Sequence, residues 1–147
     1  MRKGTWAAAG VGLAILIGLP IVARWTRGVR ENRCAFDGVR VETLFRVEAV
    51  DATGQRHEFC CIRCAQLWWS RQREYPQAIF VTDEEDGQLM DAMSAYFVRS
   101  SVVTTPTTGN RIHSFRSKGS AEKHAQSAKG TVLDGFERPF HSVRLMP

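Results

Sequence analysis

Signatures of catalysis and of nucleic-acid binding are missing from this chain of 147 residues. It has no serine, histidine and acid set, no glycine-rich phosphate loop and no paired carboxylates of the kind used in general acid–base catalysis. Its net charge of +5 is modest, and its basic residues do not form a face interleaved with aromatic side chains, as nucleic-acid binding requires. We therefore predict a protein that is not an enzyme and has no nucleic-acid partner.

Cysteine is scarce too, but its placement is informative. The chain has four cysteines, and three of them fall close together in the stretch EFCCIRCAQLWW. Cys61 and Cys64 form a CxxC pair, Cys60 and Cys64 are spaced as CxxxC, and Cys34 lies upstream in RCAFDG. Soft thiolate ligands select monovalent copper, zinc or iron–sulfur clusters. Cys34, Cys60, Cys61 and Cys64 are therefore the candidate metal ligands.

The number of thiols that can converge bears on the metal. Cys60 and Cys61 are adjacent and do not easily join one tetrahedron in a regular strand or helix. The usable set is then Cys34, Cys64 and one of that adjacent pair. Three thiols suit copper(I), which accepts two or three soft ligands, better than a closed zinc site, and iron–sulfur ligation lacks a clear fourth thiolate. We predict copper(I), with zinc as the alternative.

Besides packing as ordinary core residues, the cysteines have two other interpretations that stay open. A CxxC at the start of a helix is also the thioredoxin-type redox motif, so Cys61 and Cys64 could form a thiol–disulfide pair. A structural zinc module that docks a membrane partner is the second possibility. Asp37 stands where the second thiol of an early CxxC would sit.

A long apolar run occupies residues 4–23. A helix of about 20 apolar residues crosses a bilayer, whereas a cleaved signal peptide has a core of about 7–15. We therefore predict an uncleaved transmembrane anchor, followed by a basic linker, over residues 1–33. Basic residues after the run favour a cytoplasmic body, whereas a short N-terminus before one apolar segment is typical of export. The residues alone leave the orientation open.

The first half of the remaining chain predicts a hairpin, a helix and a strand. Residues 39–50 and 56–59 have the alternation of paired strands around a glycine turn. Residues 61–74 make an amphipathic helix, and residues 78–81 make a short buried strand. We predict that this ββαβ unit spans residues 34–82.

The same order of elements recurs in the second half, residues 83–147. Strands are expected from residue 95 onward, and Ser120 is the expected N-cap of a helix before the closing strand over residues 131–133. The fold class is thus α+β, with two similar ββαβ units. Laid over the second copy, Cys60, Cys61 and Cys64 fall on Arg116, Ser117 and Ser120. Because those counterparts are polar, we expect the cysteines at an exposed corner.

Histidine and methionine offer further donors. His57 and His113 lie on predicted strands and are interpreted as surface residues. Met90 and Met93 are three residues apart, a spacing interpreted as core packing, although methionine would also suit copper.

The order of motifs after Cys34 resembles known families of metal-handling proteins. The first half, which joins an early cysteine to FCCIRCA, resembles the treble-cysteine pattern of TRASH and YHS modules. The second half is similar to the family of NosL, an accessory protein of nitrous oxide reductase. The matching motifs are Asp91 with Ala92, Ala95 to Val98, Pro106 to Gly109, Phe115, and Ser120 to Ala128.

This resemblance implies a fold, a cargo and a location. Members of the family are built from two ββαβ units, bind copper(I) and help to supply the copper centres of nitrous oxide reductase. The resemblance thus implies a body in the periplasm, a single pass through the bacterial inner membrane at residues 4–23, and a copper-accepting enzyme or its assembly factors as partner.

The sequence departs from the family pattern at three places. No lipoprotein cysteine follows the apolar run, although members are usually lipoproteins. Asp37 and Arg40 stand where the early motif has a second cysteine and a methionine, and residues 106–109 read PTTG in place of PMG. The additional cysteines of FCCIRC are candidates to replace the missing ligands.

Overall fold

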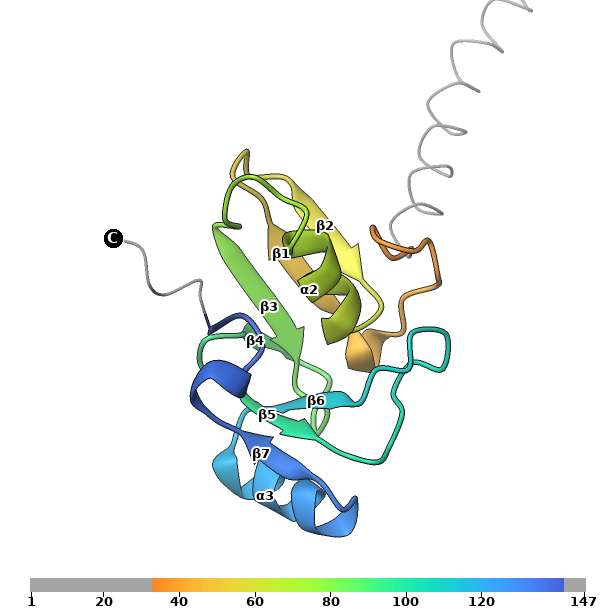
Figure 1. The fold of residues 1–147 in the computed structure, drawn as a ribbon, viewed down its shortest axis with the longest axis vertical. Helices are drawn as coiled ribbons and strands as arrows, with labels where there is room; N and C mark the ends of the chain where they lie inside the picture. The colour runs from red at the N-terminus through yellow and green to blue at the C-terminus, as the bar shows by residue number, and fades with distance from the viewer. Residues whose placement is uncertain (1–32, 142–147) are drawn as a thin grey trace, which may run out of the picture. The chain divides into compact units, whose positions relative to one another are not determined.

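Antiparallel strand pairing organises residues 33–141, the part of the chain that the computed structural model describes. The predicted anchor at residues 4–23 lies outside this range. Among residues 33–141, no helix has the length and apolar character needed to cross a bilayer. The elements, in chain order (Figure 1), are η1 (Thr43–Phe45), β1 (Val47–Val50), β2 (Arg56–Phe59), α2 (Ile62–Trp69), β3 (Ala78–Thr82), β4 (Leu89–Asp91), β5 (Tyr96–Arg99), β6 (Ile112–Phe115), α3 (Lys118–Ser127), β7 (Thr131–Leu133) and η2 (Gly135–Glu137).

The first sheet has the strand order β2-β1-β3-β4, and every neighbouring pair is antiparallel. The β1–β2 hairpin turns at Asp51, whose carboxylate accepts hydrogen bonds from the backbone N–H groups of Thr53 and Gln55. Gly54 takes a positive φ of 86° in this turn, a conformation that glycine adopts without steric cost. The hairpin returns the chain to the start of α2, which is where the cysteines lie.

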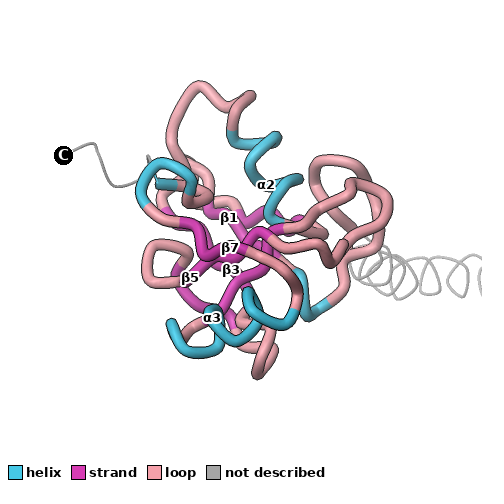
Figure 2. Tube along the Cα trace, turned by 60° about the horizontal axis from the view of Figure 1, so that its bottom comes forward, coloured by secondary structure: helices cyan, strands magenta, loops and turns pink. Residues whose placement is uncertain are grey.

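The second sheet has the order β6-β5-β7, again antiparallel, with α3 between its last two strands in the chain. In the first sheet, β1 lies between β2 and β3. In the second sheet, β5 lies in the same way between β6 and β7. Helices α2 and α3 lie on opposite sides of the strands (Figure 1, Figure 2). The α+β prediction with paired antiparallel strands is confirmed.

The two sheets are joined by hydrogen bonds between the end of β3 and β6. The Ser114 hydroxyl donates to the carbonyl of Thr82 at 2.7 Å, and the backbone N–H of Glu84 donates to the carbonyl of Ser114 at 3.0 Å. Ser114 and Thr82 are both buried, so these bonds are shielded from competing water. This junction connects the cysteine-bearing half with the second half.

The first predicted strand, residues 39–50, is wrong in its first part. Only Val47–Val50 pair as a strand, while Thr43–Phe45 form a 3₁₀ turn. The hydroxyl of Thr82 donates to the carbonyl of Arg46 at 2.8 Å and thereby holds this turn against the end of β3. The same hydroxyl also lies 3.2 Å from the carbonyl of Thr43, so long-range contacts fix a turn where the local alternation predicts a strand.

Both predicted helices have different limits in the structure. Helix α2 ends at Trp69 and not at Glu74, because Ser70 caps it and its hydroxyl donates to the carbonyl of Leu67 at 2.9 Å. The N-cap of α3 is Ser117, whose hydroxyl accepts from the N–H of Ser120, the residue predicted as the cap.

Strand β4 was not predicted from the sequence. It pairs with β3 and places Met90 opposite Val81 in the buried core. The acidic turn that precedes it, residues 83–87, closes with the N–H of Gly87 donating to the carbonyl of Asp83 at 2.8 Å. Strand β4 was missed because its three residues are too few to show a clear alternation pattern.

Candidate metal centre

The connection from β2 to α2 carries three of the four cysteines. The strand ends at Phe59 and the helix begins at Ile62, so Cys60 and Cys61 form the link between them. Cys61 is the N-cap, with extended backbone at φ −168° and ψ 167°, and Cys64 lies in the first turn of the helix. The change from extended to helical backbone turns the adjacent side chains of Cys60 and Cys61 in different directions.

The fourth cysteine arrives on a tight loop. The N–H of Cys34 donates to the carbonyl of Val39 at 2.8 Å, and the N–H of Gly38 donates back to the carbonyl of Cys34 at 2.9 Å. The loop is fixed to β2 because the N–H of Ala35 donates to the carbonyl of Glu58 at 2.8 Å. Cys34 thus reaches the start of α2, as the hairpin prediction required.

Four side chains converge at this point. The sulfur atoms of Cys34, Cys60 and Cys64 and one carboxylate oxygen of Asp37 all lie within 4.8 Å of one another. The thiol of Cys64 donates to Oδ2 of Asp37 at 3.1 Å, and the Sγ atoms of Cys60 and Cys64 are 3.6 Å apart. Three soft donors and one hard donor therefore face a common point, where a single metal ion would contact all four.

Cys61 lies beside this group of four. Its Sγ is 3.9 Å from that of Cys60 and 3.3 Å from the hydroxyl oxygen of Thr108. Of the two adjacent cysteines, the structure thus places Cys60 in the four-residue cluster. The ligand role of each cysteine stays a prediction.

The prediction that the cysteines lie at an exposed corner is wrong. Cys34, Cys60, Cys61 and Cys64 are all buried, with at most 3% of their surface exposed. The connection from β5 to β6 packs on them, since the hydroxyl of Thr105 donates to the carbonyl of Cys60 at 3.4 Å. Asp37, by contrast, is exposed and is the one member of the cluster that faces solvent.

The four thiols differ in pKa. The hydrogen bond from the thiol of Cys64 lowers the pKa of Cys34 to about 6, although burial acts in the opposite direction. The same Cys64 thiol, together with Thr108, lowers the pKa of Cys61 to about 5 against the effect of burial. The pKa of Cys64 is raised because it donates to these thiolates, and burial together with the neighbouring negative charges raises the pKa of Cys60.

Asp37 stays ionised beside these sulfurs. Burial acts to raise its pKa, but the hydrogen bonds from Cys34, Cys64 and Cys60 and from the backbone outweigh this, so the pKa lies below the usual range. The carboxylate is therefore available as an oxygen ligand, and the protons that the thiols release when they bind metal go to solvent.

Comparison with known proteins gives the family. The profile of the NosL family matches residues 30–137. The chain belongs to the NosL family. The fold is similar to the crystal structure of the copper chaperone NosL from Shewanella denitrificans, with a TM-score of 0.62 and 23% sequence identity, covering 74% of this chain and 90% of that chain. No curated protein sequence matches this chain.

Membership of the NosL family agrees with the prediction that the chain is not an enzyme. It also confirms the resemblance found from the order of motifs. Thr108 of the PTTG segment contacts Cys61, and Thr105, just before that segment, contacts the carbonyl of Cys60. A turn closed by the N–H of Gly109 donating to the carbonyl of Thr105 at 2.9 Å holds Thr108 in position.

Two residues of this NosL-family site were missed as participants. The sequence marks Asp37 only as the residue that replaces an expected cysteine, and that spacing is the signal that could have placed it in the cluster. Thr108 carries no sequence signal, because its contact with Cys61 joins residues 47 positions apart.

The histidine prediction is wrong for His113. This side chain is buried, and its Nδ1 lies 2.8 Å from Oε2 of Glu84 while its Nε2 lies 3.0 Å from the hydroxyl of Ser100. His57 is partly exposed and pairs with Asp51 at 2.8 Å. Neither histidine belongs to the cysteine cluster, so both act within the fold.

The methionines lie away from the cysteine cluster. Met90 is a buried core residue, in agreement with the packing interpretation. Met93 lines a cleft of about 530 Å³ together with Phe136 and Arg138. Neither sulfur belongs to the four-residue group.

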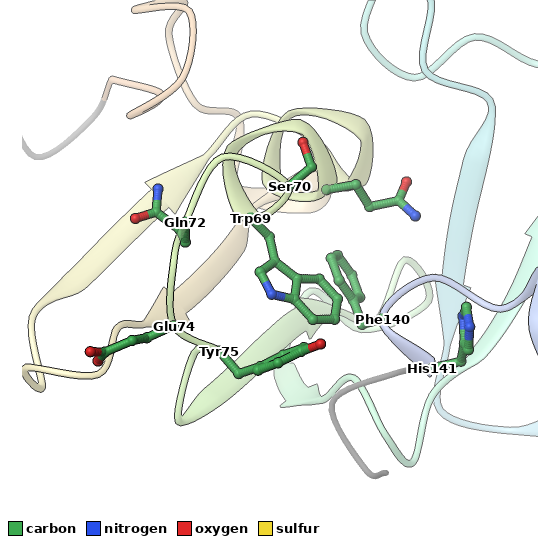
Figure 3. Close-up of a pocket in the computed structure, with 8 residues that line it drawn as sticks. Trp69, Ser70, Gln72, Glu74, Tyr75, Phe140 and His141 are labelled. Atoms are coloured by element: carbon green, nitrogen blue, oxygen red, sulfur yellow. The ribbon is translucent and has the colours of Figure 1, made fainter. Parts of the chain in front are cut away.

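A second cleft of about 390 Å³ lies at the far end of α2 from the cysteines. Figure 3 shows the rings of Trp69, Tyr75 and Phe140 close together among the residues that line it. Trp69 and Phe140 have ring centroids 5.9 Å apart, and Phe140 has a positive φ of 63°. This aromatic contact holds the end of the described chain against the last residue of α2.

Proposed function

We propose that this chain binds copper(I) as cargo through Cys34, Cys60 and Cys64 and hands it on to a partner protein. One observation carries the proposal. In a member of the NosL family, three buried thiols and one exposed carboxylate converge within 4.8 Å. Soft thiolates are the ligands that copper(I) prefers, and burial protects the bound ion from water and oxidants.

The exposed carboxylate marks the side of the site at which a partner protein can take the copper. A carboxylate oxygen is a hard donor and holds copper(I) weakly. Asp37 is the member that faces solvent, so a thiol or thioether of the partner can replace it first and join the copper while the protein thiolates still hold the ion. Copper then leaves by stepwise ligand exchange without passing through water.

The location of this reaction follows from the N-terminal run. In this proposal residues 4–23 anchor the chain in the bacterial inner membrane and the body lies in the periplasm. The length and apolar character of the run support an anchor, and the family resemblance supports the export of the body. The partner is then a copper-accepting enzyme, of the nitrous oxide reductase kind, or one of its assembly factors.

A competition titration tests the proposal. The full chain, reduced and free of oxygen, is titrated with copper(I) in the presence of a chromogenic copper(I) chelator. We expect Cys64→Ser to weaken binding at least tenfold, whereas Met93→Leu, which changes a sulfur outside the cluster, leaves the affinity unchanged. If replacing all four cysteines by serine leaves the affinity unchanged, the proposal is wrong.

Zinc is the second candidate cargo, and the structure gives a specific reason for it. Three thiolates and one carboxylate are a complete four-ligand set for zinc. A structural role predicts that zinc stays bound through purification and that a chelator unfolds the protein. A protein that keeps its circular dichroism and melting temperature after chelation is not a structural zinc module.

The thiol–disulfide alternative is less favoured by the geometry. The lowered pKa of Cys61 suits a nucleophilic thiolate, but its sulfur is buried under the loop that carries Thr108. Exchange requires that a partner thiolate reach the sulfur atom. Equilibration of the full chain with glutathione buffers, followed by mass spectrometry of alkylated thiols, measures whether a disulfide forms at all.

A further inference from the structure

The four thiols form two overlapping ligand sets. Cys60 and Cys64 lie in the middle, with sulfur atoms 3.6 Å apart. The side chain of Cys64 interacts with both Cys34 and Cys61. Cys34 shares its side with Asp37, whereas Cys61 shares its side with Thr108. The cluster therefore has two ends and a common centre.

The sulfur separations fit metal ions bridged by shared thiolates. Metal–sulfur bonds of about 2.3 Å make angles between about 100° and 120° at a metal that joins sulfur atoms 3.6–3.9 Å apart. These are the angles of tetrahedral and trigonal coordination, which copper(I) accepts with two or three soft ligands. The same two central sulfurs can serve an ion on each side.

Charge favours a second monovalent ion. One copper(I) ion compensates one thiolate, and the charged residue that contacts the thiols, Asp37, is itself an acid. Four buried thiolates around a single monovalent cation would leave uncompensated negative charge away from water, which is costly. A second copper(I) ion removes one more unit of that charge.

We propose that the site holds two copper(I) ions, bridged by Cys60 and Cys64, with Cys34 as the end ligand of one ion and Cys61 as the end ligand of the other. The inference rests on the proposed copper-binding function and specifies its capacity. Both ions stay monovalent, and each thiol that becomes a ligand releases its proton to solvent. The ion on the Cys34 side has the exposed Asp37 beside it, and the ion on the Cys61 side lies beneath the loop of Thr108.

Copper stoichiometry tests the inference separately from the function. The reduced full chain is titrated with copper(I) alone, and the loaded protein is weighed by native mass spectrometry. Two tightly bound ions per chain support the inference. One ion per chain overturns it while the proposed function stands, and no tightly bound ion overturns both.

Single cysteine variants assign the two ions. We expect Cys61→Ser to hold one ion with the affinity of the first, because serine is a favoured N-cap and keeps the start of α2 intact. Cys34→Ser is expected to lose the other ion and to retain one at the Cys61 side. If Cys61→Ser still binds two ions, Cys61 is not an end ligand and the inference is wrong; unchanged circular dichroism confirms that each variant is folded.

Discussion

The thiol of Cys64 donates a hydrogen bond to the carboxylate of Asp37 over 3.1 Å, and this bond links a fully buried sulfur to an exposed oxygen. The contact joins the start of α2 to the loop that follows Cys34. It gives the buried cluster one polar route to solvent, along which a proton can leave when metal binds and a partner ligand can enter.

Replacing Asp37 by asparagine distinguishes the two candidate metals. Asn keeps the shape and an oxygen atom but removes the charge. Because carboxylate oxygen contributes little to copper(I) binding, we expect Asp37→Asn to change the copper(I) affinity by less than about threefold while it weakens zinc binding about 10- to 100-fold. Parallel competition titrations with the two metals measure this. An equal loss for both metals would show that the carboxylate matters as a charge and not as a ligand.

The unequal thiol pKa values predict a maximum in the stability of the metal-free protein. Cys34 and Cys61 have pKa values of about 6 and about 5 when folded, below their usual value near 8.5. A lowered pKa stabilises the folded state above the unfolded value, and this contribution is lost as the pH falls through the folded values. Stability should therefore rise between about pH 5 and pH 8.5.

The other two thiols reverse the trend at higher pH. The pKa values of Cys60 and Cys64 are raised, so above about pH 8.5 the unfolded chain loses protons that these groups keep in the folded state, and this favours unfolding. Stability should fall again above about pH 8.5. Urea unfolding of the reduced protein across this range measures the curve, and a variant with all four cysteines changed to serine should lose this cysteine-dependent maximum. A maximum that persists in that variant would have to come from other groups.

Thr108 is expected to support the thiolate of Cys61. Replacing it by valine keeps the shape but removes the hydroxyl that lies 3.3 Å from the sulfur. We expect Thr108→Val to raise the pKa of Cys61 and to lower the free energy of unfolding by about 1 kcal/mol. The pH dependence of thiolate absorbance at 240 nm reports the pKa. Thr107→Val, an exposed neighbour in the same loop, is the matched control and should change neither quantity.

Local sequence patterns were sufficient to predict much of the fold. Strands β2 and β7 have the limits predicted from alternation and turn residues, Arg56–Phe59 and Thr131–Leu133. The hairpin at Gly54 was also predicted, and it explains how Cys34 reaches the other thiols. These features depend on residues that are close in the sequence, so short-range rules describe them well.

The environment of the site could not be predicted in the same way. The burial of Cys60 depends on Thr105, and the position of the Cys34 loop depends on the bond between Ala35 and Glu58. These contacts join residues far apart in the sequence and leave no periodic pattern. The comparison of the cysteines with polar residues of the second copy failed for this reason, because it compared local positions and not the loops that cover them.

Replacing His113 tests the stability of the fold separately from metal binding. Its buried ring joins Glu84 at the end of β3 to Ser100 beside the second sheet. His113→Ala leaves a cavity and an unpaired carboxylate, so we expect a loss of about 2–4 kcal/mol in the free energy of unfolding. His57→Ala, which removes the other strand histidine from a partly exposed pair, should cost about 1 kcal/mol. Urea unfolding measures both losses, and copper stoichiometry should stay that of the parent in each folded variant. If the copper stoichiometry changes for His113→Ala alone, the junction between the two sheets contributes to the metal centre.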